Sequence, residues 1–144
     1  MEDAEDAWCD FLTHSGNIYT KLRAACYGHP LDFGWFGKQL DERARDPLLL
    51  YIHKARNSET HRLDATVEQA PEASHDAEIN NRPVRINFPR HLRPVPVTDE
   101  HGNVYDAPTT HFDEPLGYCD ASMLALFATI YFEWLVNAAS SRLR

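Results

Sequence analysis

The sequence predicts an all-α fold, a four- or five-helix up-and-down bundle with a Pro-rich, partly β-hairpin insertion before the last helix. Three observations lead to this prediction. Apolar residues recur at three- and four-residue steps in several segments, and seven of the nine prolines fall within an insertion at about residues 71–115. The length of 144 residues, with 43% hydrophobic content, suits one domain over residues 1–144.

Helical periodicity defines the first two elements. Residues 4–27 carry an apolar stripe on one helix face, formed by Trp8, Phe11, Leu12, Ile18, Tyr19, Leu22 and Cys26. Acidic residues in the first turn suit the positive end of the helix dipole, and Gly28 followed by Pro30 ends the helix. A second helix is predicted over residues 31–44, although Gly34 and Gly37 weaken it by about 1 kcal/mol each relative to alanine.

Asp46 and Pro47 predict the start of a third helix, because aspartate caps free backbone amides and proline fits the first helical position. We expect this helix to run to about Ala70, before Pro71. Its predicted apolar side consists of Leu48, Leu49, Ile52, Ala55, Leu63 and Val67.

The last helix is predicted over residues 120–142 and is apolar almost all round, which fits either the central helix of the bundle or a dimer interface. Its most apolar stretch, residues 123–136, contains Glu133 and is shorter than the ~20 residues of a bilayer span. No membrane association is therefore expected. Within the insertion, Val84 to Phe88 alternate like a short strand, and His101-Gly102-Asn103 predicts a turn between Val95–Val97 and Val104–Tyr105.

Composition limits the partners and the compartment. The formal charge of −8 repels nucleic acid on average, so an RNA ligand would need a local basic patch. Such a patch is predicted in the insertion, where no acid occurs between Glu78 and Asp99; it consists of Arg82, Arg85, Arg90, His91 and Arg93. Three separated cysteines and the lack of an apolar leader favour a reducing, cytoplasmic location.

The segment from Arg56 to His61 is the main functional candidate, because it places Arg56, Asn57 and His61 on one well-capped helix. A guanidinium binds phosphate oxygens through a fork of donors, and an imidazole takes and gives protons near neutral pH. An Arg–His pair at this spacing arises about 0.6 times by composition alone, so the helical context carries the argument.

At Arg56, Asn57 and His61 the chain resembles the HEPN superfamily, in which many ribonucleases carry an Arg, a following polar residue and a His four to six positions after the Arg. The resemblance covers the first, third and last predicted helices. It implies a homodimer with both Arg and His sets in a shared cleft, and a toxin or defence component that works beside an antitoxin protein.

The chemistry implied is endoribonuclease cleavage without a metal or other cofactor. A ribose 2′-hydroxyl attacks the adjacent phosphorus, His61 moves a proton, Arg56 balances charge on the phosphoryl oxygens and Asn57 orients His61 or binds phosphate. On an ideal helix Arg56 and His61 diverge by about 140°, whereas Asn57 and His61 share a face. One helix would not easily aim both at one phosphate, and a two-fold interface removes this difficulty if residues of both copies converge.

Other interpretations stay open. Arg56 could form a surface ion pair with Glu59, His61 could face solvent, and the arginine patch could be a solvated surface. The eight histidines show no metal-binding spacing, so no metal is predicted. The alternative function is a non-catalytic HEPN-like module that binds a protein partner or a nucleotide.

Overall fold

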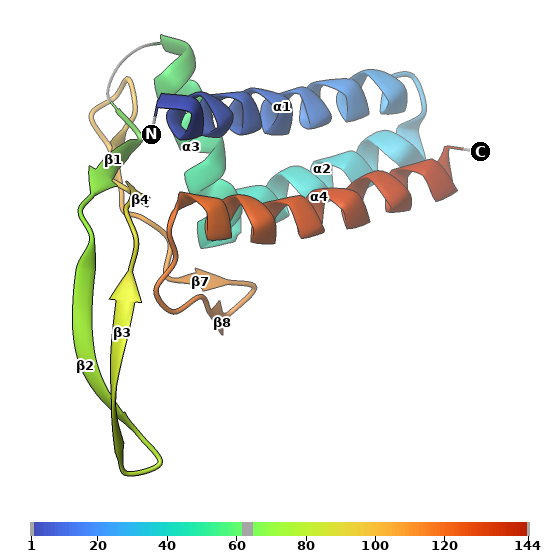
Figure 1. The fold of residues 1–144 in the computed structure, drawn as a ribbon. Coiled ribbons are helices and arrows are strands. Elements are labelled where there is room, and N and C mark those ends of the chain that lie inside the picture. The colour runs from blue at the N-terminus through green and yellow to red at the C-terminus, as the bar shows by residue number, and fades with distance from the viewer. Residues whose placement is uncertain (1, 62–64, 144) are drawn as a thin grey trace.

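Three long helices lie side by side, and a shorter helix crosses one end of them (Figure 1). The computed structural model describes residues 2–61 and 65–143. The long helices are α1 (Glu2–Cys26), α2 (Pro30–Arg45) and α4 (Ala121–Arg142), and the crossing helix is α3 (Pro47–His61). The strands are β1 (Val67–Ala70), β2 (Ala73–Ile79), β3 (Arg82–Phe88), β4 (His91–Pro94), β5 (Val97–Thr98), β6 (Val104–Tyr105), β7 (Thr110–His111) and β8 (Glu114–Pro115).

The all-α prediction is wrong. Helices account for 57% of the chain and strands for 20%, so the fold combines helices with β-hairpins. In the described part of the chain the strands pair antiparallel as β1 with β4, β2 with β3, β5 with β6, and β7 with β8. The helices also depart from a simple up-and-down bundle, because α3 runs across the others (Figure 1).

The third helix is shorter than predicted. It ends at His61 instead of about Ala70, and Val67–Ala70 pair with His91–Pro94 as strands β1 and β4. Leu63, predicted on its apolar side, lies outside the described residues. Long-range hydrogen bonds explain the change. Thr66 is fully buried, accepts a hydrogen bond from the Trp8 indole at 2.9 Å, and its carbonyl accepts one from the Val95 amide at 3.1 Å.

The other helices follow the sequence signals closely. The apolar stripe of α1 supplies Trp8, Leu12, Tyr19, Leu22 and Cys26 to the core. Asp46 caps α3 as predicted, since its Oδ1 accepts a hydrogen bond from the Leu49 amide at 2.9 Å. The same buried carboxylate accepts hydrogen bonds from His111 Nδ1 at 2.9 Å and from the Phe112 amide at 2.6 Å. It therefore fastens the β7–β8 hairpin to the start of α3.

Helix α4 is only half buried. Its inner side packs into the core through Leu124, Ala128, Phe132, Leu135 and Ala139, while its opposite side is exposed. By length and composition alone it is the one helix of the described chain that could cross a membrane, and 33% of its most apolar window is buried within the fold. The core helix of a globular protein meets the same criteria of length and composition.

The insertion holds the predicted β structure, and part of it extends away from the helices. The turn at residues 101–103 joins β5 to β6, and residues 84–88 lie within β3. Strands β2 and β3 pair over seven residues each and form a ribbon that projects from the helices (Figure 1). We call this ribbon, Ala73–Phe88, the arm. Its turn residues Asn80 and Asn81 both have positive φ angles, of 52° and 59°, as a tight hairpin turn requires.

Candidate functional site

Helix α3 presents two different faces because its packing fixes its rotation. Its buried side consists of Leu48, Leu49, Tyr51, Ile52, Ala55 and Ser58. Lys54, Asn57 and His61 follow one another at steps of three and four residues, so they share a face away from the centre of that buried side. This arrangement brings an ammonium, an amide and an imidazole together on one strip of helix.

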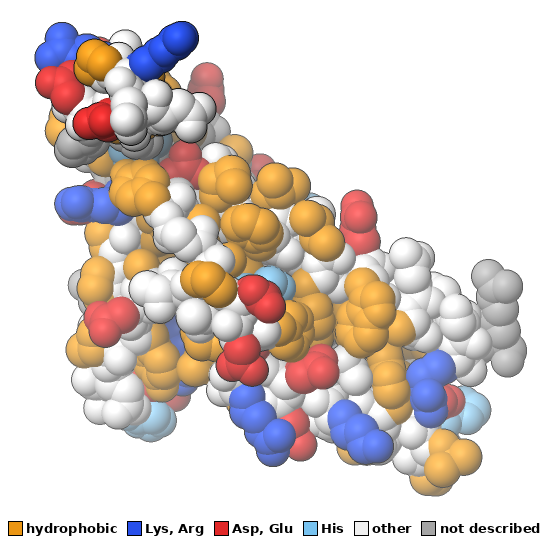
Figure 2. Space-filling view, turned by 90° about the horizontal axis from the view of Figure 1, so that it is seen from below, with side chains coloured by type: hydrophobic (Ala, Val, Ile, Leu, Met, Phe, Trp, Pro, Cys, Tyr) orange, Lys and Arg blue, Asp and Glu red, His pale blue; other side chains and the backbone are white. Residues whose placement is uncertain are grey.

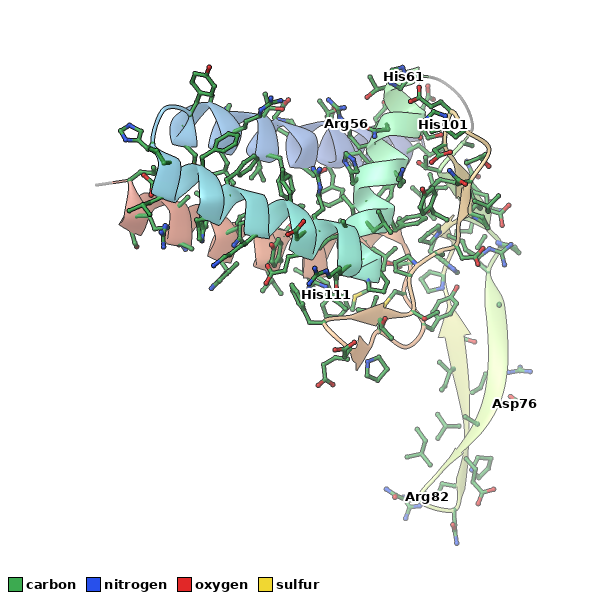
Figure 3. All side chains as sticks on the ribbon, turned by 180° about the vertical axis from the view of Figure 1, so that it is seen from behind. Arg56, His61, Asp76, Arg82, His101 and His111 are labelled. Carbon is green, nitrogen blue, oxygen red and sulfur yellow. The ribbon has the colours of Figure 1, made fainter. Side chains whose placement is uncertain are left out.

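These three side chains line a small cavity with the β5–β6 turn. The cavity has a volume of about 150 Å³ and is lined by Lys54, Asn57, Ser58, His61, Asp99, Glu100 and His101. We call it the His61–His101 pocket. Figure 3 shows His61 and His101 close together at the end of α3, although they come from segments 40 positions apart in sequence. At about 30 Å³ per water molecule, the pocket has room for roughly five waters or a group of similar size.

Asp99 holds the turn that carries His101. Its Oδ1 accepts hydrogen bonds from the backbone amides of His101 and Asn103, each at 3.0 Å, and its Oδ2 accepts one from the Tyr105 hydroxyl at 3.0 Å. Burial alone would raise the pKa of Asp99, but hydrogen bonds from Asn103, Lys54 and Tyr105 hold that pKa well below its usual range. The carboxylate therefore stays ionised and keeps the turn in place.

Lys54 contributes the positive charge of the pocket. Its Nζ lies 3.2 Å from Asp99 Oδ2 and 4.5 Å from the centre of the Tyr105 ring. The interaction with Tyr105, and then the one with Asp99, raise the pKa of Lys54 against the opposing effect of burial. An ammonium group has three N–H donors, and Lys54 interacts with both Asp99 and Tyr105. An anion in the pocket would therefore compete with these partners for Lys54.

Arg56 points in a different direction. Its side chain lies against α1, and a Cβ added at Gly16 would stand 2.6 Å from Arg56 Nε, so the absence of a side chain at Gly16 makes room for it. Within the described residues, Arg56 Nε is buried without a hydrogen-bond partner, while the Arg56 Nη1 donates to Asn57 Oδ1 at 3.2 Å. Arg56 is not among the residues that line the His61–His101 pocket. Its contact with the pocket is through Asn57.

The ion pair between Arg56 and Glu59, one of the open interpretations, is not among the contacts of the described chain. Glu59 instead accepts a hydrogen bond from the Thr66 hydroxyl at 2.7 Å. His61 is exposed at the end of α3. Of the three predicted catalytic residues, the structure thus brings Asn57 and His61 to one pocket and leaves Arg56 behind Asn57.

The predicted RNA-binding arginines lie along the arm and at its base. Arg85 pairs with Asp76 across the arm at 3.2 Å, and Arg93 pairs with Glu68 on the adjacent strand. Arg82 sits at the tip of the arm, at the opposite end of the molecule from His61 (Figure 3). Arg90 lines a separate cavity. These four arginines therefore do not gather around the His61–His101 pocket.

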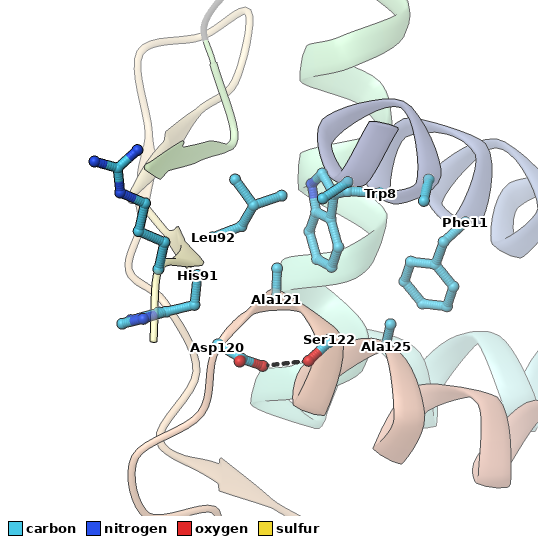
Figure 4. A pocket seen from close by; sticks show the side chains of 11 residues that line it. Trp8, Phe11, His91, Leu92, Asp120, Ala121, Ser122 and Ala125 are labelled. Carbon is cyan, nitrogen blue, oxygen red and sulfur yellow. Dashed lines mark hydrogen bonds between the residues drawn. The ribbon is translucent and has the colours of Figure 1, made fainter. Parts of the chain in front are cut away.

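That separate cavity is larger but offers less chemistry (Figure 4). It has a volume of about 430 Å³ and is bounded on its apolar side by Trp8, Phe11, Leu92, Ala121 and Ala125. Its carboxylate, Asp120, is engaged, since it caps α4 by accepting from the Met123 amide at 2.9 Å and accepts from the Ser122 hydroxyl at 2.6 Å. His91 also lines the cavity, but its two ring nitrogens hydrogen-bond to the Pro89 carbonyl and the Tyr118 hydroxyl.

Sequence reasoning missed Lys54, Asp99 and His101. The spacing of Lys54 to Asn57 and His61 was a usable signal, because three- and four-residue steps mark one helix face. The position of His101 had no such signal, since only the folded chain brings the turn to α3. Among the described residues, no group of three or more His, Cys, Asp or Glu side chains is placed to hold a metal ion. Searches of protein-family models, curated proteins and solved structures gave no match to this chain.

Proposed function

We propose that this protein is a metal-independent endoribonuclease that cleaves RNA by attack of a 2′-hydroxyl on the neighbouring phosphorus, in the His61–His101 pocket. The observation that supports the proposal is the presence of two imidazoles, an ammonium and an amide in one cavity of about 150 Å³. Transesterification needs one group to accept the 2′-hydroxyl proton and another to protonate the leaving 5′-oxygen. Two histidines that line one small cavity, from α3 and from the β5–β6 turn, can divide these tasks.

We assign the role of base to His61 and the role of acid to His101. Glu100 Oε1 lies 3.6 Å from His101 Nε2, so a carboxylate stands beside the imidazole assigned as the acid. Lys54 would stabilise the negative charge that grows on the phosphoryl oxygens, and Asn57 would hold one of these oxygens. Arg56 then acts as a positioning residue, because it holds the Asn57 side chain from behind. The products would be a 2′,3′-cyclic phosphate and a 5′-hydroxyl.

The proposal is tested with labelled single-stranded RNA and with the His61→Ala, His101→Ala and His29→Ala variants. His29 is an exposed histidine far along the chain from the pocket and serves as the matched control. We expect each pocket variant to lower kcat by about 10²-fold or more, the control to be unaffected, and EDTA to have no effect on the wild type. Loss of activity with EDTA, or full activity of either pocket variant, would refute the mechanism.

The pH dependence gives a second test. An acid and a base acting together produce a bell-shaped profile of kcat/KM. His101→Ala should remove the alkaline limb, because that limb reports loss of the proton from the acid, and His61→Ala should remove the acidic limb. Growth arrest on expression, relieved by His61→Ala, would support a toxin or defence role for the same activity. Arrest unaffected by that substitution would favour the non-catalytic binding module.

A further inference from the structure

The arm has one polar face and one apolar face. Cross-strand register places Asp76 opposite Arg85 and Ser74 opposite Asn87 on the polar face. On the other face, Ala77 lies opposite Val84 and Ile79 opposite Arg82, with Ile86 next along β3. Ile79, Val84 and Ile86 are 52%, 39% and 38% exposed, and none of the arm side chains that the structure describes belongs to the hydrophobic core. An isolated two-stranded ribbon is at best marginally stable in water, so its apolar face needs a cover.

A second exposed apolar surface runs along α4. Met123, Leu126, Ile130 and Trp134 recur at three- and four-residue steps and are 39–57% exposed. Phe112 of the β7–β8 hairpin extends this surface and, with Ile130, Tyr131 and Trp134, lines a groove of about 370 Å³. Figure 2 shows hydrophobic side chains gathered over this side of the molecule. We call this surface the α4 stripe.

The two apolar surfaces meet at a corner. The arm projects from the side of the molecule that carries the α4 stripe and runs across the direction of α4 (Figures 1 and 2). Asp76 points away from the helices (Figure 3), so the opposite, apolar face of the arm borders the same open space as the α4 stripe. An occupant of this corner must offer apolar surface in two directions.

We propose that a second copy of this chain occupies the corner, in a two-fold dimer in which the arm of each copy lies against the α4 stripe of the other. The proposal is independent of the proposed function. A second copy carries the same two surfaces at the same angle, so one two-fold axis covers both arms and both α4 stripes at once. Each copy contributes eight apolar side chains, three from the arm, Phe112 and four from α4. With each side chain about half exposed out of roughly 200 Å², the two copies together would bury on the order of 1,600 Å², the size of a standard interface.

Charge supports the same pairing. Arg82 at the tip of the arm forms no ion pair within the described chain, and it lies directly opposite Ile79 at the end of the apolar face. Exposed acids flank the α4 stripe, namely Glu133 beside Trp134 and Asp113 beside Phe112. Arg82, at the tip end of the arm's apolar face, would meet an apolar stripe with acidic edges, which is complementary in both respects, and charged rims of this kind set the register of an interface.

The test measures mass in solution for the full chain and for three Glu substitutions. Light scattering after gel filtration should give about 33 kDa, twice the 16.5 kDa of one copy. Ile79→Glu on the arm and Ile130→Glu on α4 should each weaken the dimer at least tenfold. Leu31→Glu replaces an exposed leucine on α2, 85% accessible and away from the corner, and should leave the dimer intact. Circular dichroism verifies that each variant keeps its helices.

Crosslinking distinguishes the exchanged arm from other dimers. Ile79→Cys protein mixed with Ile130→Cys protein should form a mixed disulfide between the two chains, and Leu31→Cys in place of Ile130→Cys should not. A monomeric wild type would overturn the proposal. A dimer whose affinity is unchanged by Ile79→Glu, or one that forms no mixed disulfide, would overturn it as well. Binding of the monomer to anionic or neutral lipid vesicles through Ile130 would show a membrane as the occupant and would equally overturn it.

Discussion

Thr66→Val tests the long-range hydrogen bonds that end α3 and position the strands behind the pocket. Thr66 is fully buried; its hydroxyl accepts from Trp8 Nε1 at 2.9 Å and donates to Glu59 Oε1 at 2.7 Å. Valine has nearly the same shape, so the substitution removes both hydrogen bonds and leaves almost no cavity. The substitution leaves the indole N–H of Trp8 without a hydrogen-bond partner, and the Trp8 side chain is buried.

The expected cost follows from these contacts. A buried donor left without a partner costs about 1–3 kcal/mol, and loss of the bond to the Glu59 carboxylate adds about 1 kcal/mol. We therefore expect the free energy of unfolding to fall by about 2–4 kcal/mol. For a chain of this size each 1 kcal/mol lowers Tm by about 3 °C, which predicts a decrease of about 6–12 °C.

Urea denaturation followed by circular dichroism measures the effect, with two comparisons. Thr20→Val makes the same chemical change at an exposed site on α1, where the hydroxyl bonds only to the Gly16 carbonyl, and should cost less than about 0.5 kcal/mol. In a Trp8→Phe background no indole N–H remains to be stranded, so Thr66→Val should cost only about 1 kcal/mol. An equal cost in both backgrounds, or one below about 0.5 kcal/mol in the wild type, would refute the reasoning.

Three further predictions concern the helices around the site. Asp46→Ala removes the cap of α3 and the acceptor for His111 and Phe112, so urea denaturation should show a loss of about 3–5 kcal/mol. Burial, and then the charges of Arg43, Lys54 and Arg56, lower the pKa of His53 to about 4 from its usual 6.5. The free energy of unfolding should therefore fall as the pH is lowered from 6.5 to 4, by at most about 3 kcal/mol. His53→Gln should flatten this pH dependence. Gly34→Ala should stabilise α2 by up to about 1 kcal/mol, whereas Gly16→Ala should lower Tm unless Arg56→Ala accompanies it.

Local signals were enough to locate the helices. The start of α3 was predictable because Asp46 and Pro47 act on their own neighbours, and α1, α2 and α4 were predictable because each has an apolar face or continuous apolar character. The error lay where local and distant interactions compete. Val67 continued the helical spacing of α3, but its segment pairs with residues 91–94 as a strand. No sequence pattern near residue 67 announces that partner.

The candidate site was predictable to a similar extent. Helical geometry alone separates Arg56 from His61 and joins Asn57 to His61, and the structure has this arrangement. The direction of Arg56 depended on Gly16, a residue 40 positions earlier, whose lack of a side chain admits the guanidinium stem. His101 was equally remote, because Asp99 and Tyr105 fix its turn through contacts that form only when α3 and the β5–β6 hairpin meet.

The orientation of α3 explains why the positive charge in the pocket comes from Lys54. Tyr51, Ala55 and Ser58 are buried, so the helix cannot rotate to bring Arg56 toward His61 without exposing them. A rotation of about 100° separates neighbouring residues, and this places Lys54 and Asn57 on the pocket side and Arg56 beside α1. Asp99 both holds His101 in place and offsets the charge of Lys54. In the proposed cleavage reaction the phosphate must therefore compete with Asp99 for Lys54, and Asp99→Asn should strengthen phosphate binding while loosening the turn that carries His101.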